Sequence, residues 1–263
     1  MTDRGVEANL NFIPVQNKSW TWNLNVNFAY NKNLITKLVN NSKDSTFYGD
    51  ETGGIAGATG QTIQINTVGY TPLSFFVLQQ VYGKNGKPLE GTYVDQNRDG
   101  QVTEPNDQIH YHSPFAPVIM GLSTSVTYLK WTLSMVARGN FGNWVYNNVD
   151  AGNGTTRYIY NSAGGTGYLS NIRSDYSKTG FYYPQFQSSY YVQNASFVKM
   201  DNIGLTYNYG KIWGRANLKL SLNCQNVFVI TKYTGIDPEV YGGIDNNIYP
   251  RPRNFTVGAN VNF

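Results

Sequence analysis

Apolar and polar residues alternate with a period of two along several segments of this chain. In residues 255–263, every odd position from Phe255 to Phe263 is apolar, and every even position is Thr, Gly or Asn. Successive side chains of a β-strand point to opposite faces, so the segment is predicted to be a strand with one apolar and one polar face. A soluble sandwich and a membrane barrel both produce this alternation, and the segment alone does not distinguish them.

The same alternation recurs in six further segments, at residues 6–12, 20–30, 122–128, 131–138, 203–209 and 217–225. The run from Trp20 to Tyr30 has eleven residues, and about 9–11 tilted residues cross a bilayer. Glu7, Arg138 and Lys219 all fall on polar faces. A basic residue facing lipid near the bilayer centre would cost about 2–4 kcal/mol, so a water-filled interior explains these positions. We therefore predict seven spanning strands.

One segment breaks the alternation. Lys199 and Asp201 occupy positions of the same parity as Ile203 and Leu205, so a regular strand would place charged and apolar side chains on one face. We expect either a β-bulge near Asp201 and Asn202, where an extra residue changes the parity, or a position of this end above the hydrocarbon.

The connections between the expected strands are of two kinds. Short turns lie near Gln16, Leu129 and Trp213, whereas long connections run over about residues 32–114, 141–189 and 232–250. Bacterial outer-membrane barrels have short periplasmic turns and longer extracellular loops, so we expect the long connections to be extracellular. Because single-chain bacterial barrels close with an even number of strands, seven strands indicate a barrel segment with an open edge at its first strand.

Composition favours an all-β membrane protein over several other classes. The chain of 263 residues has 21 Tyr, 13 Phe and 5 Trp but only 14% charged residues, against about 25% in soluble domains. No segment approaches the ~20 consecutive apolar residues of a membrane helix. The single Cys224 excludes an internal disulfide framework. The net charge of +4, without a basic stripe, does not indicate a nucleic-acid partner. The first residues lack the secretory signal that an outer-membrane protein needs, so either the outer-membrane inference is wrong or the chain is the downstream piece of a longer protein.

A series of sequence blocks extends over the whole chain. Residues 226–239 read Asn-Val-Phe-Val-Ile-Thr-Lys-Tyr-Thr-Gly-Ile-Asp-Pro-Glu, and further blocks lie at residues 5–7, 30–33, 93–100, 195–203 and 249–253. In this order the blocks resemble the barrel of SusC/RagA-type TonB-linked (TonB-dependent) outer-membrane proteins of Bacteroidetes. The block at residues 226–239 is similar to the penultimate strand and last extracellular loop of that family.

This resemblance implies a transmembrane antiparallel β-barrel of about 22 strands, a size at which the lumen is plugged, with this chain as about its last seven strands. It also implies TonB-driven import of a glycan or peptide across the cell outer membrane, with a SusD-like surface lipoprotein as partner. The barrel-assembly machinery and outer-membrane lipid are further implied partners. The plug domain and the N-terminal region that contacts TonB would then be absent from this chain. By the same resemblance, the aromatic terminal strand with Phe255 and Phe263 is the assembly signal.

Residues 95–107 contain a candidate calcium site. The first part of an EF-hand-like loop has oxygen ligands at alternate positions and a glycine at its sharp turn. The candidate ligands in this chain are Asp95, Asn97, Asp99, Gln101 through its carbonyl, and Asp107. The loop departs from the pattern at its end, where Asn106 stands at the twelfth position and Pro105 interrupts the approach. A structural Ca²⁺ and a metal-free turn rich in Asp and Asn both fit the sequence.

The remaining motifs do not indicate an enzyme. His110 and His112 do not belong to a constellation of nucleophile and carboxylate, so we interpret them as loop residues near an interface. Aromatic side chains in the long connections could stack on sugar rings or pack on each other, and no single substrate contact is predicted. The alternative to the barrel is a secreted, calcium-dependent carbohydrate-binding β-sandwich, in which the apolar rows would be buried between two sheets.

Overall fold

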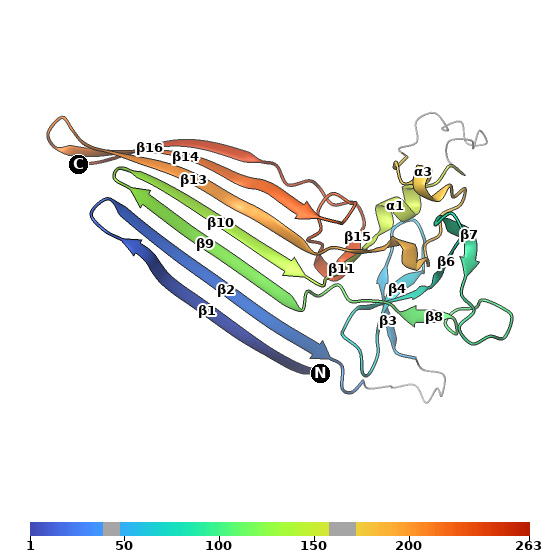
Figure 1. Ribbon diagram of the computed structural model, residues 1–263. Helices are drawn as coiled ribbons and strands as arrows, with labels where there is room; N and C mark the ends of the chain where they lie inside the picture. Colours follow the sequence, from blue (N-terminus) through green and yellow to red (C-terminus); the bar gives the residue numbers. More distant parts are fainter. Residues whose placement is uncertain (39–47, 158–171) are drawn as a thin grey trace.

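The computed structural model describes residues 1–38, 48–157 and 172–263. Its largest element is an antiparallel sheet of seven strands in the order β1-β2-β9-β10-β13-β14-β16 (Figure 1). The strand bounds are Thr2–Gln16, Trp20–Leu34, Val118–Tyr128, Trp131–Phe141, Phe197–Ile212, Ala216–Thr231 and Asn254–Asn262. The seven strands predicted from the alternation are therefore confirmed, and most extend beyond the alternating runs.

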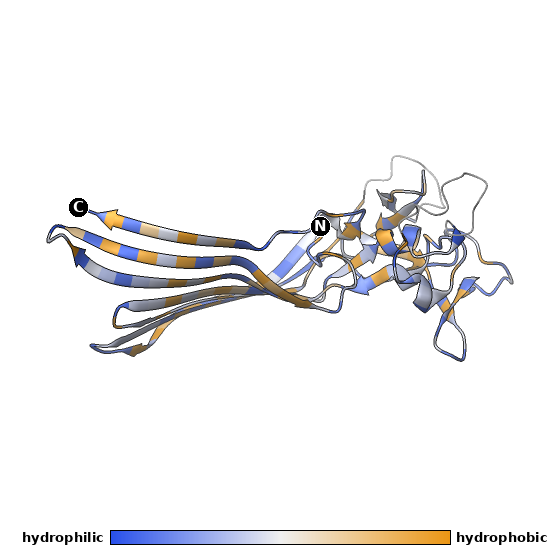
Figure 2. Ribbon diagram, turned by 90° about the horizontal axis from the view of Figure 1, so that it is seen from above, coloured by the Kyte–Doolittle hydropathy of each residue, from blue (hydrophilic) through white to orange (hydrophobic). Residues whose placement is uncertain are grey.

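Each strand of this sheet separates its apolar and polar side chains. Leu222 lies opposite Val257 on the apolar face, whereas Lys219 lies opposite Asn260 on the polar face. Figure 2 shows the resulting alternation along the strands and the curvature of the sheet, as in a segment of barrel wall. Leu222 and Val257 are 54% and 81% exposed. A sandwich would bury this apolar row against a second sheet, so the exposed row favours the barrel over the sandwich.

The bulge expected near Asp201 is present. In the pairing with β10, Met200 and Asn202 lie opposite the consecutive residues Ala137 and Val136, so Asp201 has no partner residue there. The pairing with β14 is interrupted at the same position. The extra residue changes the parity of β13. Lys199 therefore lies opposite Arg138 on the polar face.

Short turns join the strands at one end of the sheet, at the three predicted positions (Figure 1). They comprise residues 17–19, 129–130 and 213–215. Leu129 and Trp213 have φ values of 53° and 50°, in the left-handed region that tight hairpins often require. Near these turns the rings of Trp20 and Tyr128 lie 4.3 Å apart between centroids.

The long connections are residues 35–117, 142–196 and 232–253, and their described parts fold beyond the other end of the sheet (Figure 1). The first contains β3 (Asp50–Gly54), β4 (Thr62–Asn66), β5 (Ser74–Leu78), β6 (Gln80–Tyr82), β7 (Pro88–Tyr93) and β8 (Gln108–His110). The second contains β11 (Trp144–Asn147), α1 (Asn148–Asn153), α3 (Tyr176–Thr179), η2 (Ser189–Tyr191) and β12 (Val192–Asn194), and the third contains η3 (Tyr241–Gly243) and β15 (Ile244–Asp245). β11 pairs with both β12 and β15, so one small sheet joins the second and third connections. None of the described helices is long and apolar enough to cross a membrane.

The hydrophobic core lies among these connections. Ile63, Phe75, Tyr146, Phe181 and Tyr191 belong to one buried cluster and are each at most 1% exposed. The first two come from the first connection and the other three from the second, so the two connections bury apolar surface against each other. Burial of this kind is the main stabilising contribution to folding. The connections therefore form a packed unit on which a functional surface can be held.

Candidate functional site

Rows of amide side chains lie along the polar face of the seven-stranded sheet. Asn25 of β2 donates from Nδ2 to Oδ1 of Asn9 in β1, 3.0 Å away. Gly121 of β9 lies opposite Asn27, and a Cβ at that glycine would meet the Asn27 side chain at 2.5 Å. The glycine thus leaves room for an amide to lie across the neighbouring strand. These rows form a hydrophilic surface suited to water and polar solutes.

A cluster of charged residues joins this polar face to the third connection. We name it the latch, and it consists of Arg138, Lys199, Asp201, Asp237, Glu239 and Arg251. Arg138 donates from Nη1 and Nη2 to the two carboxylate oxygens of Glu239. Its Nε donates to Asp201 at 2.8 Å. The bulge residue and the loop carboxylate therefore share one guanidinium, in the two-pronged geometry that makes such pairs strong.

Lys199 lies at the buried centre of the latch, with its side chain 4% exposed. Its Nζ donates to Asp237 at 2.7 Å and to Glu239 at 3.0 Å. Arg251 approaches the same two carboxylates at 3.1 Å. Hydrogen bonds from Arg138 and Lys199, opposed by burial, lower the pKa of Glu239 to about 2. The latch thus keeps Glu239 ionised and ties the third connection to the sheet.

A second polar cluster ties the third connection to the second. Asp150 of α1 is 2% exposed, and it accepts hydrogen bonds from Nε of Arg173 at 2.8 Å and from Oγ1 of Thr234 at 3.2 Å. The hydroxyl of Tyr233 donates to Asp245 at 2.6 Å. Tyr233 and Thr234 follow β14 closely, so the chain is held on both sides where it leaves the sheet.

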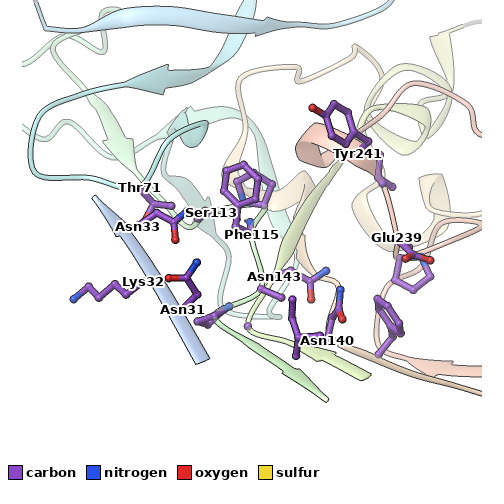
Figure 3. Close-up of a pocket in the computed structure, with 18 of the residues that line it drawn as sticks. Asn31, Lys32, Asn33, Thr71, Ser113, Phe115, Asn140, Asn143, Glu239 and Tyr241 are labelled. Atoms are coloured by element: carbon purple, nitrogen blue, oxygen red, sulfur yellow. Dashed lines mark hydrogen bonds between the residues drawn. The ribbon is translucent and has the colours of Figure 1, made fainter. Parts of the chain in front are cut away.

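A cavity of about 790 Å³ lies beside the latch, between the ends of β2 and β10 and the first and third connections (Figure 3). In Figure 3, Asn31 and Asn33 of β2 point toward the cavity, whereas Lys32 extends away from it. Asn140 lines the side formed by β10, and Glu239 of the latch lines the side formed by the third connection. The cavity therefore brings together residues from strand ends and from all three long connections.

The structure places the predicted calcium ligands in the loop between β7 and β8. Asp107 is fully buried. Its Oδ1 accepts the backbone N–H of Gln96 at 2.7 Å, and its Oδ2 accepts that of Thr103 at 2.7 Å. Asp107 thus holds the two ends of the loop together.

The other predicted ligands lie in the turn that Asp107 closes. The carboxylate of Asp95 accepts the backbone N–H of Gly100 at 2.8 Å, and that of Asp99 accepts the backbone N–H of Gln101 at 2.8 Å. Asn97 donates from Nδ2 to Asp99, also at 2.8 Å. Within the described ranges, no group of three His, Cys, Asp or Glu side chains is placed to hold a metal. Hydrogen bonds of the loop's own side chains account for its shape, and calcium binding stays a prediction.

The two histidines pack on aromatic rings. The ring centroids of His110 and Tyr70 lie 3.6 Å apart, and those of His112 and Trp144 lie 3.5 Å apart. Burial lowers the pKa of both histidines. Their stacked neighbours agree with the interpretation of both residues as loop-packing residues.

Phe255 and Phe263, the predicted assembly signal, lie at edge strand β16. Phe255 pairs with Cys224 on the apolar face and is 76% exposed, and Phe263 is 96% exposed. Both rings are accessible to a partner, and their role in assembly stays a prediction.

Sequence reasoning missed the latch and the cavity. Two signals for the latch were present: the parity conflict at Lys199 and Asp201, and two acidic residues flanking Pro238 in the third connection. A cation such as Lys199, placed where its strand should be apolar, is a candidate for an ion pair with carboxylates elsewhere in the chain.

The curved amphipathic sheet, with its connections gathered at one end, defines the protein as a β-barrel wall segment. Over 98% of its length the chain is 35% identical to the TonB-dependent receptor SusC of Bacteroides thetaiotaomicron. The chain belongs to the SusC/RagA-type TonB-dependent receptors, as its sequence blocks predicted. A TonB-dependent receptor of Formosa agariphila is 24% identical over 99% of the chain. The chain covers 26% and 30% of the length of these two relatives. No protein-family model matches it.

Solved structures show the same fold. The RagAB peptide transporter superposes with a TM-score of 0.71 at 23% identity, covering 98% of this chain and 29% of that one. The RagAB peptide importer in its 'open-open' state gives a TM-score of 0.68 at 25% identity, covering 99% of this chain and 28% of that one. The predicted all-β barrel class is confirmed.

Proposed function

We propose that this chain forms wall strands and outer loops of an outer-membrane importer, which carries a glycan or a peptide inward with energy delivered through TonB. The observation that carries the proposal is the seven-stranded amphipathic wall with its connections packed at one end, in a chain 35% identical to a SusC receptor. The mechanism is gated passage of solute, and we assign no catalytic residue.

The two faces of the sheet have separate roles in this proposal. The apolar row, which includes Leu222 and Val257, contacts lipid, and the asparagine rows line the lumen. The strand edges support a larger closed barrel. Among the described strands β1 pairs only with β2, and all of its 15 residues are exposed. Its unpaired backbone groups are free to bind another strand, as barrel closure requires.

The packed connections are the proposed docking surface for a SusD-like surface lipoprotein. Exposed aromatic residues suit such an interface because they bury large area at low entropic cost. Tyr183, Tyr241 and Tyr249 are 53%, 104% and 88% exposed. The chain covers 26% of the length of its SusC relative. We propose that TonB acts on the part of the complete receptor that lies outside this chain.

Gene deletion tests the import function. Cells that lack the complete receptor should fail to take up one glycan or peptide class, and the same uptake should stop when TonB is removed. The receptor should sediment with the outer membrane and require detergent for extraction. Uptake that is unchanged without the receptor, or a receptor found in the aqueous fraction, would contradict the proposal.

A further inference from the structure

The third connection does not take the direct route between the strands that it joins. β14 and β16 are neighbours in the sheet, so a short turn could join them. Instead, Asp237 bonds to Lys199 of β13. Glu239 reaches farther and bonds to Arg138 of β10. β10 lies two strands from β14, so the middle of the third connection extends sideways across the end of the sheet.

This middle segment lies on the polar face of the sheet. Lys199 lies on that face, and Phe197, two residues before it in β13, lies on the same side. Phe197 and Lys199 are 2% and 3% exposed, whereas Lys219, on the same face near the short turns, is exposed. Asn140 of β10 also lies on this face and lines the cavity together with Glu239 (Figure 3). The third connection therefore covers one end of the face that lines the lumen in the proposed importer.

A hydrogen bond ties the two ends of this segment together. The hydroxyl of Tyr233 donates to Asp245 at 2.6 Å, and both residues are buried. We name the residues between them, 234–244, the strap. Val240 packs against the buried cluster that contains Tyr233. These contacts close the base of the strap, as in compact surface loops whose ends lie close together.

The strap bends sharply beside its base. Gly242 and Gly243 have φ values of 72° and 80°, which residues with a side chain rarely adopt. The carbonyl of Gly242 accepts a hydrogen bond from Nε2 of Gln64 at 2.7 Å. The bend is thus held to the first connection, and the part of the strap that can move lies between this bend and the tip.

The tip of the strap is held by charges. The strap supplies the carboxylates of Asp237 and Glu239. The cations come from outside it: Arg138, Lys199 and Arg251. Lys199 is buried, but the side chains of Arg138, Glu239 and Arg251 are 32%, 29% and 50% exposed. Partly exposed ion pairs contribute little stability because water competes for them, whereas buried contacts hold the base. Opening of the strap therefore begins at its tip.

We propose that the strap is a gate at the outer mouth of the lumen, which swings open about its base when the latch releases. In the closed position the strap covers the polar face where a solute enters. In the open position it uncovers Phe197 and Lys199 and widens the entrance. Opening is a local transition of the strap, and the strands of the sheet stay in place. The inference rests on the proposed import function, because a gate requires a transport lumen.

The accessibility of a cysteine on the lumen face tests the gate. The reporter is Ser123→Cys in the complete receptor, with Cys224 and any other cysteine replaced by serine. Ser123 lies on the polar face opposite Asn25, farther from the long connections than the latch. Intact cells are treated with a polyethylene-glycol maleimide, which is bulky and enters only from outside, or with the small N-ethylmaleimide. Lys199→Met releases the latch, and Lys219→Met is the matched control on the same face.

A second reporter, Tyr249→Cys, measures the amount of receptor at the cell surface. Tyr249 is 88% exposed and lies outside the strap, so its reaction should not depend on the latch. Labelling rates of Ser123→Cys are expressed relative to this reporter.

We expect Lys199→Met to raise the labelling rate of Ser123→Cys by the bulky reagent about tenfold or more, with little change for N-ethylmaleimide and none in Lys219→Met. Adding Asp237→Leu to Lys199→Met should return the rate to that of the native latch, since a tip without buried charges closes again. An unchanged rate in Lys199→Met, or an equal rise with both reagents or in both lysine variants, would overturn the gate.

Failure of the import function is seen separately, because labelling requires no transport. A strap that responds to Lys199→Met in a receptor without TonB-dependent uptake would remove the import function and leave the moving strap standing. Uptake that depends on TonB, together with labelling that ignores the latch, would remove the gate alone.

Discussion

Replacing Lys199 by methionine tests whether the latch holds the third connection on the sheet. Lys199→Met keeps the apolar stem of the side chain but removes the cation bonded to Asp237 and Glu239. Asp237 is 8% exposed; within the described residues it would keep the backbone N–H of Glu239 and, as its cation, Arg251, whose side chain is 50% exposed. Glu239 would keep Arg138 and Arg251. The variant therefore leaves Asp237 as a buried carboxylate with a weak partner.

Removing one partner of a buried ion pair costs about 3–5 kcal/mol. The two arginines still neutralise part of the acidic charge, so we expect a loss near the lower end, about 3 kcal/mol. A loss of this size increases the equilibrium constant for local opening of the third connection roughly 100-fold.

Amide hydrogen exchange of the receptor in detergent measures that opening. Residues 232–253 should exchange roughly 100-fold faster in Lys199→Met, while the strands of the sheet should be unchanged. Lys219→Met is the matched control, because Lys219 lies on the same polar face opposite Asn260 and has no ion pair within the described ranges. Lys199→Met combined with Asp237→Leu should restore slow exchange, since both buried charges are then removed. Unchanged exchange in Lys199→Met, or equal acceleration in Lys219→Met, would refute the reasoning.

Three further predictions concern the latch, assembly and calcium. The pKa of Glu239 in the folded protein is lowered from 4.5 to about 2, so its stabilising contribution is complete above about pH 4.5 and is lost as the pH falls toward 2. Proteolysis within residues 232–253 of the native receptor should therefore rise as the pH falls over that range. The Glu239→Gln variant should show no such rise. Phe263→Ser in the complete receptor should reduce the amount of barrel at the cell surface, with Tyr249→Ser as an exposed loop control, and equal surface levels would argue against the assembly signal. Crystals soaked in Ca²⁺ should give an anomalous peak beside Asp95 and Asp99 that Asp95→Ala removes, whereas a soaked crystal without a peak would identify a metal-free turn.

The strands were predictable because each one meets two different environments. Leu222 and Lys219 lie on opposite faces of the same strand, and the period of two in the sequence reports this directly. The bulge was predictable for a related reason. A charge at Lys199 conflicts with the parity of its strand, and one extra residue at Asp201 removes the conflict.

The packing of the connections was not predictable in the same way. These segments have no regular period, so nothing in the local sequence distinguishes the buried Phe75 from the exposed Tyr241. The latch depends on long-range contacts, since Arg138 and Glu239 are 101 residues apart in the chain. The cavity likewise needs the ends of β2 and β10 and all three long connections to be placed together.

By itself, then, the sequence determined the strand positions, the polar and apolar faces, the short turns, the bulge and the family. The family follows from the order of the sequence blocks. The structural features follow from interactions between near neighbours and from the strict period of a β-strand. Only the tertiary structure decided that Lys199 is buried between two carboxylates and that strand ends and long connections enclose a cavity. Such features depend on contacts between segments far apart in the chain, and these contacts form only when the connections pack against the end of the sheet.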